Sequence, residues 1–194
     1  MSVPFPSDSH EPASNNADTQ RPAPALLQGE ILVETRSHSA WGGAVTAQMY
    51  LPLRRDRVWQ QLTDYPRWVQ YFPDLIRSEV LNPVVGAIHE SPLQGCKRLY
   101  QDAHKACFFL SIQVEAYLNV FEVVQQQIKF RLEKGSFTDF AADLKLQDAG
   151  VGTLLTYEVQ ATPTIPVPSI FIEQAIKLDL PANMGRMRQI LCGS

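Results

Sequence analysis

Apolar side chains recur every three or four residues along the last part of the chain, 168–191. The residues of this set are Ile172, Ile176, Leu180, Met184, Met187 and Leu191. The spacing predicts a helix with one apolar stripe, which must lie against another apolar surface. Pro181 falls within the pattern and lacks a backbone N–H donor, so we expect a bend near Lys177–Pro181.

Apolar and polar residues alternate over much of the preceding chain, which is typical of strands with one buried face. The alternating segments are 31–35, 45–51, 110–120, 128–132, 140–146 and 155–159. Turn-forming residues such as Lys134-Gly135-Ser136 and Asp148-Ala149-Gly150 separate the later ones. The pattern predicts a sequentially connected antiparallel sheet, whose dry face only the C-terminal helix is long enough to cover.

Helical spacing interrupts this alternation at 53–73. Val58 and Leu62 are four residues apart, and Pro66 both ends a first helix and can open a second. Pro73 ends the second. We predict two short helices in a V, inserted between the first strand and the remaining sheet. Trp41-Gly42-Gly43, just before them, indicates a turn between two strands or a bend within one.

The first 28 residues hold five prolines among Ser, Asn, Asp and Ala, with few side chains to bury. Ordering such a segment costs more conformational entropy than its contacts return. We therefore predict a disordered tail over 1–28 and a single domain over 29–192, within the 194 residues of the chain.

The composition is that of an ordinary globular protein, with 19% charged residues and a formal net charge of -3. The compact basic group around Asp56 (Arg54, Arg55 and Arg57) is interpreted as a solvated helix start, so we predict no nucleic-acid partner. Three cysteines without paired spacing, no secretory signal and no apolar run of membrane-spanning length predict a cytoplasmic protein.

No nucleophile with an adjacent base stands out, and no metalloprotease, hydrolase-elbow or P-loop motif occurs. Cys96, His104 and Cys107 have spacings unlike known zinc ligands, so we predict no metal and no cofactor. Asp64, at a helix junction, is expected to cap a helix. The sequence therefore favours binding over catalysis and identifies no catalytic residue.

A longer signature begins with Val58-Trp59-Gln60-Gln61-Leu62-Thr63-Asp64-Tyr65, followed by Trp68, Tyr71, Phe72 and Pro73. It continues through Lys134-Gly135-Ser136-Phe137 to Leu180-Pro181-Ala182-Asn183-Met184. Together these motifs resemble the START-like (SRPBCC) superfamily, which groups polyketide cyclases and dehydrases, lipid-transfer domains, the birch-pollen-allergen type and coenzyme Q-binding proteins. One departure is Ser136, where nearer relatives often have Asp.

The resemblance covers roughly residues 30–192 and implies the α+β helix-grip fold. In that fold a strongly curved antiparallel sheet wraps around a long C-terminal helix, and two small helices close one end. A cavity between helix and sheet would hold a hydrophobic small molecule. The candidate ligand-binding residues are Phe130, Phe140, Leu144, Tyr157, Ile172, Ile176, Leu180, Met184 and Met187. The alternative is that these residues are plain core.

The segment 162–172 is uncharged and apolar between its prolines and leads directly into the C-terminal helix. We predict that Ile165, Val167 and Phe171 form a portal at the mouth of the cavity and touch a membrane surface weakly. The alternative is a proline-rich linker packed on the sheet edge.

We therefore expect a non-enzymatic carrier of a lipid, an isoprenoid quinone or a polyketide-like compound. One alternative is an aromatase/cyclase-type enzyme, in which a tyrosine or an acid assists proton transfer. Another is a protein-interaction module without a ligand. Each of these agrees with the resemblance, because its motifs specify a fold more closely than a ligand.

Overall fold

The structure, a computed structural model, describes residues 22–39, 42–81, 96–107, 110–165 and 178–193. Its strands form one antiparallel sheet in the order β1-β2-β8-β7-β6-β5-β4-β3. The strands are β1 (Leu32–Ser37), β2 (Gly43–Leu51), β3 (Leu75–Leu81), β4 (Cys96–Cys107), β5 (Leu110–Val123), β6 (Gln127–Gly135), β7 (Phe137–Ala149) and β8 (Gly152–Pro163). The helices are α1 (Pro24–Leu27), α2 (Arg55–Leu62), the 3-10 turn η1 (Tyr65–Arg67), α3 (Trp68–Tyr71) and α5 (Leu180–Cys192).

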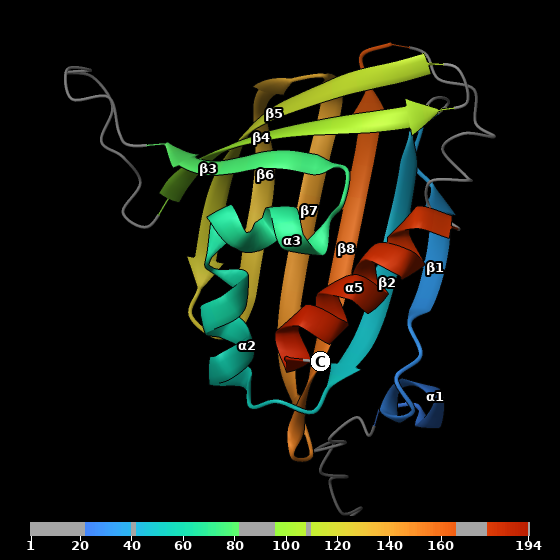
Figure 1. Ribbon diagram of the computed structural model, residues 1–194, viewed down its shortest axis with the longest axis vertical. Helices are drawn as coiled ribbons and strands as arrows, with labels where there is room; N and C mark the ends of the chain where they lie inside the picture. Colours follow the sequence, from blue (N-terminus) through green and yellow to red (C-terminus); the bar gives the residue numbers. More distant parts are fainter. Residues whose placement is uncertain (1–21, 40–41, 82–95, 108–109, 166–177, 194) are drawn as a thin grey trace, which may run out of the picture.

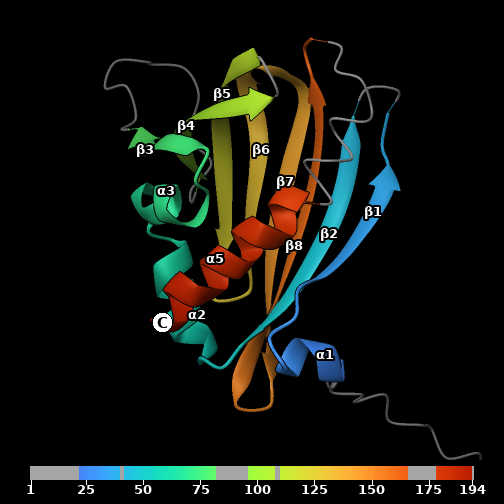
Figure 2. The ribbon, with the colours of Figure 1, turned by 45° about the vertical axis from the view of Figure 1, so that its right-hand side comes forward.

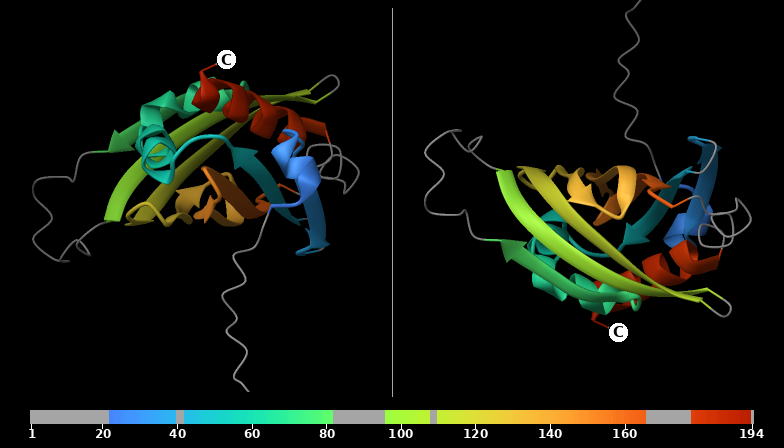
Figure 3. Two further views of the ribbon diagram at one scale, coloured as in Figure 1. Left: turned by 90° about the horizontal axis from the view of Figure 1, so that it is seen from below. Right: turned by 90° about the horizontal axis from the view of Figure 1, so that it is seen from above.

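The sheet is strongly curved, and α5 lies across its concave side (Figures 1 and 2). The helices α2 and α3 stand on the same side, as the views from below and above show (Figure 3). The predicted α+β helix-grip fold is thus confirmed. Two strands precede the short helices, because β1 and β2 pair as an antiparallel hairpin on either side of residues 38–42.

Two strands that are neighbours in sequence, β2 and β3, lie far apart in the sheet. β2 pairs with β8, whereas β3 forms the edge opposite β1. The connection between them therefore crosses the concave side of the sheet, and its apolar residues Val58, Leu62 and Trp68 are buried there. The sheet order explains why a helical segment with a wide apolar surface interrupts the strand pattern.

The alternation predicted for the strands is visible in their burial. On β7, Ala142, Leu144 and Leu146 are buried, whereas Asp143 and Lys145 between them are only partly covered. The buried side chains face α5, and Asp143 and Lys145 face outward, because successive side chains of a strand point to opposite faces.

The predicted helix over 168–191 lies partly outside the described residues, which resume at Leu178. The described α-helix begins at Leu180, and Pro181 occupies its first turn, where a missing N–H removes no intrahelical hydrogen bond. Leu178 and Asp179 precede it in a π-helical turn. The bend expected near Lys177–Pro181 stays a prediction, because residues 166–177 are not described.

The helix α1 lies within the segment predicted to be a disordered tail. Its Leu26 is 2% exposed and packs in a small apolar cluster with Tyr50, Ala149 and Leu154. The buried Leu26 side chain ties this short helix to the sheet through tertiary contacts, and the extent of the tail stays a prediction. Residues 1–21 lie outside the described part of the chain.

Gly135 ends β6 at a point where the pairing with β5 shifts register between Tyr117 and Leu118. Its φ is +148°, and a side-chain carbon there would press on the backbone of Glu115. The next residue, Ser136, donates its N–H to the Glu115 carbonyl oxygen (2.8 Å), and its Oγ accepts the Glu115 N–H (3.0 Å). Ser136 thus has a backbone-bonding role, which an Asp carboxylate could also fill.

We expect Gly135→Ala to lower the free energy of unfolding by at least about 2 kcal/mol, from the unfavourable φ and the steric contact. Gly185→Ala is the matched control, because Gly185 lies inside α5 with open space around its Cα. There the change should stabilise the fold by up to about 1 kcal/mol, the helix-propensity difference. Urea denaturation followed by circular dichroism measures both. Equal effects of the two changes would contradict this account of Gly135.

Candidate functional site

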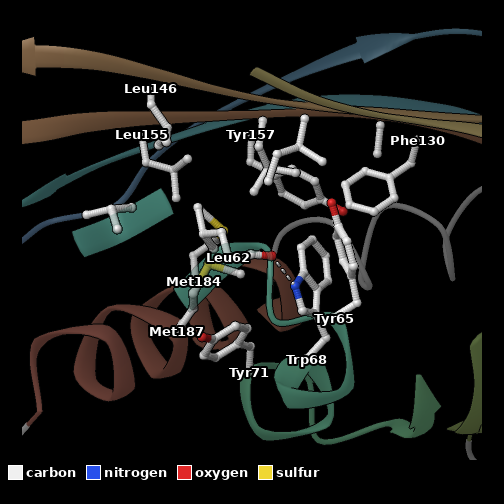
Figure 4. Close-up of a cluster of buried hydrophobic side chains, with 14 of the residues drawn as sticks. Leu62, Tyr65, Trp68, Tyr71, Phe130, Leu146, Leu155, Tyr157, Met184 and Met187 are labelled. Atoms are coloured by element: carbon white, nitrogen blue, oxygen red, sulfur yellow. Dashed lines mark hydrogen bonds between the residues drawn. The ribbon is translucent and has the colours of Figure 1, made fainter. Parts of the chain in front are cut away.

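The described candidate residues come together on the concave side of the sheet. Phe130, Leu144, Tyr157, Met184 and Met187 are buried in one apolar cluster, and Phe140 and Leu180 are partly buried against it. Figure 4 shows several of them between the sheet and α5. Ile172 and Ile176 lie outside the described residues. The periodicity thus selected residues that share a face, and their role toward a ligand stays a prediction.

Burial falls along β8 and α5 from one end of the concave face to the other, whereas Val45 on β2, which pairs with Val159, is 4% exposed. On β8, Leu155 is fully buried, Tyr157 is 8% exposed, and Val159 is only partly buried. α5 follows the same trend, from buried Met187 to partly buried Leu180.

The concave face has two parts that differ in exposure. The closed half contains Met49, Leu51, Leu144, Leu146, Leu155, Met184 and Met187, which are all at most 3% exposed. The open end contains Leu132, Phe137, Phe140, Val159 and Leu180, which are all partly exposed. The closed half is a dry core, whereas the open end keeps accessible apolar surface.

An aromatic cluster lies near Tyr157, built from two distant parts of the chain. The Trp68 ring is 5.1 Å from the Phe130 ring and stacks on Phe72 at 5.7 Å, measured between ring centroids. The Tyr65 ring meets Phe130 edge-on at 6.1 Å, and Phe72 lies 6.5 Å from Tyr157. The sequence predicts that Trp68 and Phe72 lie in the second short helix and contains Tyr65 in the family signature, but none of the three was among the predicted site residues. The signal in the sequence that could have pointed to them is the family signature, which contains all three residues.

Polar atoms of the short helices have protein partners. Trp68 donates its indole N–H to the Leu62 carbonyl oxygen at 2.9 Å, deep in the core. Tyr65 donates its hydroxyl to Glu122 Oε1 at 2.5 Å, and burial, followed by this bond to Glu122, raises the pKa of Tyr65 well above its usual range. Lys97 Nζ donates to the same carboxylate oxygen at 2.6 Å. These bonds hold the aromatic cluster in one arrangement.

Tyr157 lies beside this cluster on β8 and is 8% exposed. Burial raises the pKa of Tyr157 to about 12, so the phenol stays protonated and can donate a hydrogen bond. Figure 4 shows its ring on the side of the sheet that faces Trp68 and Met184. Its role toward a ligand stays a prediction.

Side-chain bonds tie α5 to its surroundings along its later turns. Gln61 Nε2 on α2 donates to the Leu191 carbonyl oxygen at 3.0 Å. Arg186 Nε donates to the Gln70 carbonyl oxygen at 2.7 Å, and Arg188 Nε donates to that of Tyr50 at 3.1 Å. These contacts hold the helix at the closed half.

Two hollows are lined by described residues, and both lie on the outside of the molecule. One, of about 200 Å³, lies at the start of α2 and the β7–β8 turn, where Arg55 pairs with Asp148 at 3.1 Å. The other, of about 260 Å³, lies on the convex face, where Arg131 pairs with Asp143 at 2.7 Å. Their charged walls do not suit an apolar ligand. Neither is the cavity expected beneath α5, which stays a prediction.

The predicted portal lies partly within the described residues. Ile165, just after β8, is 68% exposed, whereas Val167 and Phe171 lie outside the described residues. Within the described ranges, no three His, Cys, Asp or Glu side chains are gathered as metal ligands would be. None of the helices described is long and apolar enough to cross a membrane.

The family model for "Polyketide cyclase / dehydrase and lipid transport" matches residues 51–188 of the chain. This span runs from the end of β2 into α5 and includes the short helices, Tyr157 and most of the concave face. No curated protein matches the sequence.

Several solved structures have a similar fold. A STAR-related lipid transfer protein from Xanthomonas axonopodis is 15% identical, with 82% of this chain and 98% of that chain covered and a TM-score of 0.56. A START superfamily protein from Mycobacterium smegmatis is 15% identical, with 77% and 94% covered and a TM-score of 0.55. The Zhui aromatase/cyclase from Streptomyces sp. R1128 is 13% identical, with 78% and 92% covered and a TM-score of 0.55. At these identities the likeness concerns the fold.

The raised pKa of Tyr157 predicts a pH dependence of stability. The ordinary pKa of an unfolded tyrosine is 10.0, whereas burial raises the pKa of the folded Tyr157 to about 12. Its contribution is therefore fully present below pH 10 and is lost as the pH rises from about 10 to 12. Urea midpoints of wild type and Tyr157→Phe, measured at pH 9 and pH 11, should differ in favour of the variant at the higher pH. Parallel loss of stability in both proteins would contradict the prediction.

Proposed function

The chain belongs to the polyketide cyclase / dehydrase and lipid transport family of START-like (SRPBCC) proteins, and on this premise we propose that it binds a hydrophobic small molecule at the open end of its concave face. A lipid, an isoprenoid quinone or a polyketide-like compound fits this surface. The observation that carries the proposal is the fall in burial from Leu155 to Val159 and from Met187 to Leu180.

The physical basis of the proposal is apolar surface that faces inward but remains partly wet. Phe140, Val159 and Leu180 belong to three different elements and all turn toward the same side of the sheet. Removing such surface from water contributes about 25 cal/mol per Å². In the closed half, side chains of the protein itself already supply this cover, so Leu144, Met184 and Met187 would hold the wall behind the ligand.

An aromatase/cyclase-type enzyme is the second candidate, because the description of the family names cyclases and dehydrases. In that case Tyr157 would be the proton donor, since its phenol is buried and protonated. Turnover that is lost in Tyr157→Phe while binding is kept would favour the enzyme. A complex with another protein that survives removal of bound lipid would instead favour an interaction module.

The binding proposal predicts that a charge at the open end weakens uptake of a neutral apolar probe. We expect Val159→Asp to lower the affinity for N-phenyl-1-naphthylamine at least about tenfold, because a buried carboxylate would lose its hydration. Val124→Asp is the control, since Val124 is 68% exposed in the β5–β6 turn. Fluorescence titration measures both.

Two outcomes would argue against binding at the open end. One is failure of the wild-type protein to take up the probe at all, together with no small molecule recovered by native mass spectrometry after organic extraction. The other is equal affinity of Val159→Asp and Val124→Asp with both variants folded by circular dichroism.

We also propose a weak membrane contact near the open end, supported by the exposure of Ile165. An exposed isoleucine can insert into a lipid interface, whereas an aspartate cannot. In flotation with phosphatidylcholine–phosphatidylglycerol vesicles, Ile165→Asp should recover less protein with the lipid than wild type. Val151→Asp, changed at an exposed residue of the β7–β8 turn, is the control. Equal flotation of the three proteins would rule out a role for Ile165.

A further inference from the structure

Strand β3 forms one edge of the sheet, opposite β1 (Figure 1). Among the described residues its backbone pairs on one side only, with β4. An edge strand presents N–H and C=O groups that can extend the sheet with another chain. The exposed residues of β1 are the polar Glu34, Thr35 and Arg36. β3 also exposes large apolar side chains, Ile76 at 54% and Val80 at 44%, so it is the less protected edge.

The concave face of the sheet is incompletely covered along β3. Val80 lies opposite Leu99 of β4, which is fully buried, so both side chains point to the concave face. Ser78, on the same face of β3, is 4% exposed, and its Oγ accepts a hydrogen bond from Gln101 Nε2 at 3.3 Å. The face is therefore covered at Ser78 and exposed at Val80. A further strand beside β3 would cover Val80 with its own side chains.

Two charges of opposite sign flank Ser78 on the convex face of β3. The Arg77 guanidinium bonds to the Glu79 carboxylate at 2.7 and 2.8 Å, and it lies 5.4 Å from the centroid of the Tyr100 ring. The side chains of Arg77 and Glu79 are 55% and 47% exposed, and such an exposed ion pair contributes little stability. Both charges can therefore be shared with a second pair at low cost.

Antiparallel pairing of two β3 strands about Ser78 uses both features. In this register Arg77 of one copy lies opposite Glu79 of the second copy, and two-fold symmetry repeats the contact. Four charges then alternate in sign around a square, which favours the pairing. The same register brings Val80 near Ile76 of the second copy. A register shifted by two residues would instead place Glu79 opposite Glu79, so the charges select the first register.

We propose that β3 is an interaction surface for a second copy of this chain, which pairs with it edge to edge, antiparallel and centred on Ser78. The pairing of β3 with β4 is irregular between Leu75 and Arg77, so the regular part of the edge is short. Short contacts give weak dimers that depend on concentration. Pairing at β3 is independent of ligand binding, because the residues of the open end lie on β6, β7, β8 and α5.

Sedimentation velocity of the full chain over a concentration series tests the pairing. Wild type should dimerise with a dissociation constant below about 100 μM. In Arg77→Glu or in Glu79→Arg like charges would lie opposite one another, so the dissociation constant should rise at least about tenfold. An equimolar mixture of these two variants should associate at least as tightly as wild type, because each acid then faces a base.

Arg36→Glu is the matched control. Arg36 lies two residues from Glu34 on the other edge strand, β1, which repeats the spacing of the two charges on β3. This change should leave the dissociation constant unaltered. As a measurement that needs no variant, hydrogen exchange of the β3 amides should slow as the protein concentration rises, whereas exchange of the β1 amides should stay the same.

Three outcomes would overturn the inference. One is a wild-type protein that stays monomeric over the whole series. Another is a dimer that Arg36→Glu weakens and Arg77→Glu does not, which would place the contact at β1. The third is a mixture of Arg77→Glu and Glu79→Arg that stays monomeric although both variants are folded by circular dichroism, because pairing about Ser78 requires that the mixture associate.

Discussion

The contact between the apolar stripe of α5 and the concave sheet holds the rest of the structure in place. Met184, Met187 and Leu191 are all nearly inaccessible to solvent, and they belong to one apolar cluster with residues of β2, β7 and β8. Either surface alone would expose apolar area to water. Burying that area contributes a free energy of about 25 cal/mol per Å². Gln61 bonds to the Leu191 backbone and Arg188 to the Tyr50 backbone. These hydrogen bonds orient α5 on the sheet, whereas apolar burial provides the stability of the contact.

This contact also divides the concave face. Where the later turns of α5 lie on the sheet, protein side chains exclude water completely, and the result is an ordinary core. Toward Leu180 the same face keeps partly exposed apolar side chains. The strands run from the closed half to the open end without a break. One continuous surface can therefore form the core at one end and the proposed binding site at the other.

The aromatic cluster stands at the border between these two parts. Trp68 and Tyr65 are fixed by hydrogen bonds to Leu62 and Glu122, so their rings form a rigid wall. Tyr157 lies beside this wall, with its ring 6.5 Å from the Phe72 ring. A rigid wall would orient the proposed ligand at little entropic cost.

The sequence by itself determined the fold class and the faces of its elements. A two-residue period placed Leu144 and Tyr157 on the buried side of their strands, and a period near four placed Met184 and Met187 on the buried side of α5. Periodicity reports the direction of each side chain relative to its own backbone, and that direction survives any arrangement of the elements.

Only the tertiary structure decided which of these residues remain accessible and which neighbours they meet. Trp68 on α3 and Phe130 on β6 touch because a helix packs on a strand far from it in sequence, and no local pattern encodes that packing. Leu26 is buried for the same reason, against β2 and the β7–β8 hairpin. The difference between Leu155 and Val159 depends on where α5 crosses a curved sheet, and this is a property of the packed molecule rather than of any segment.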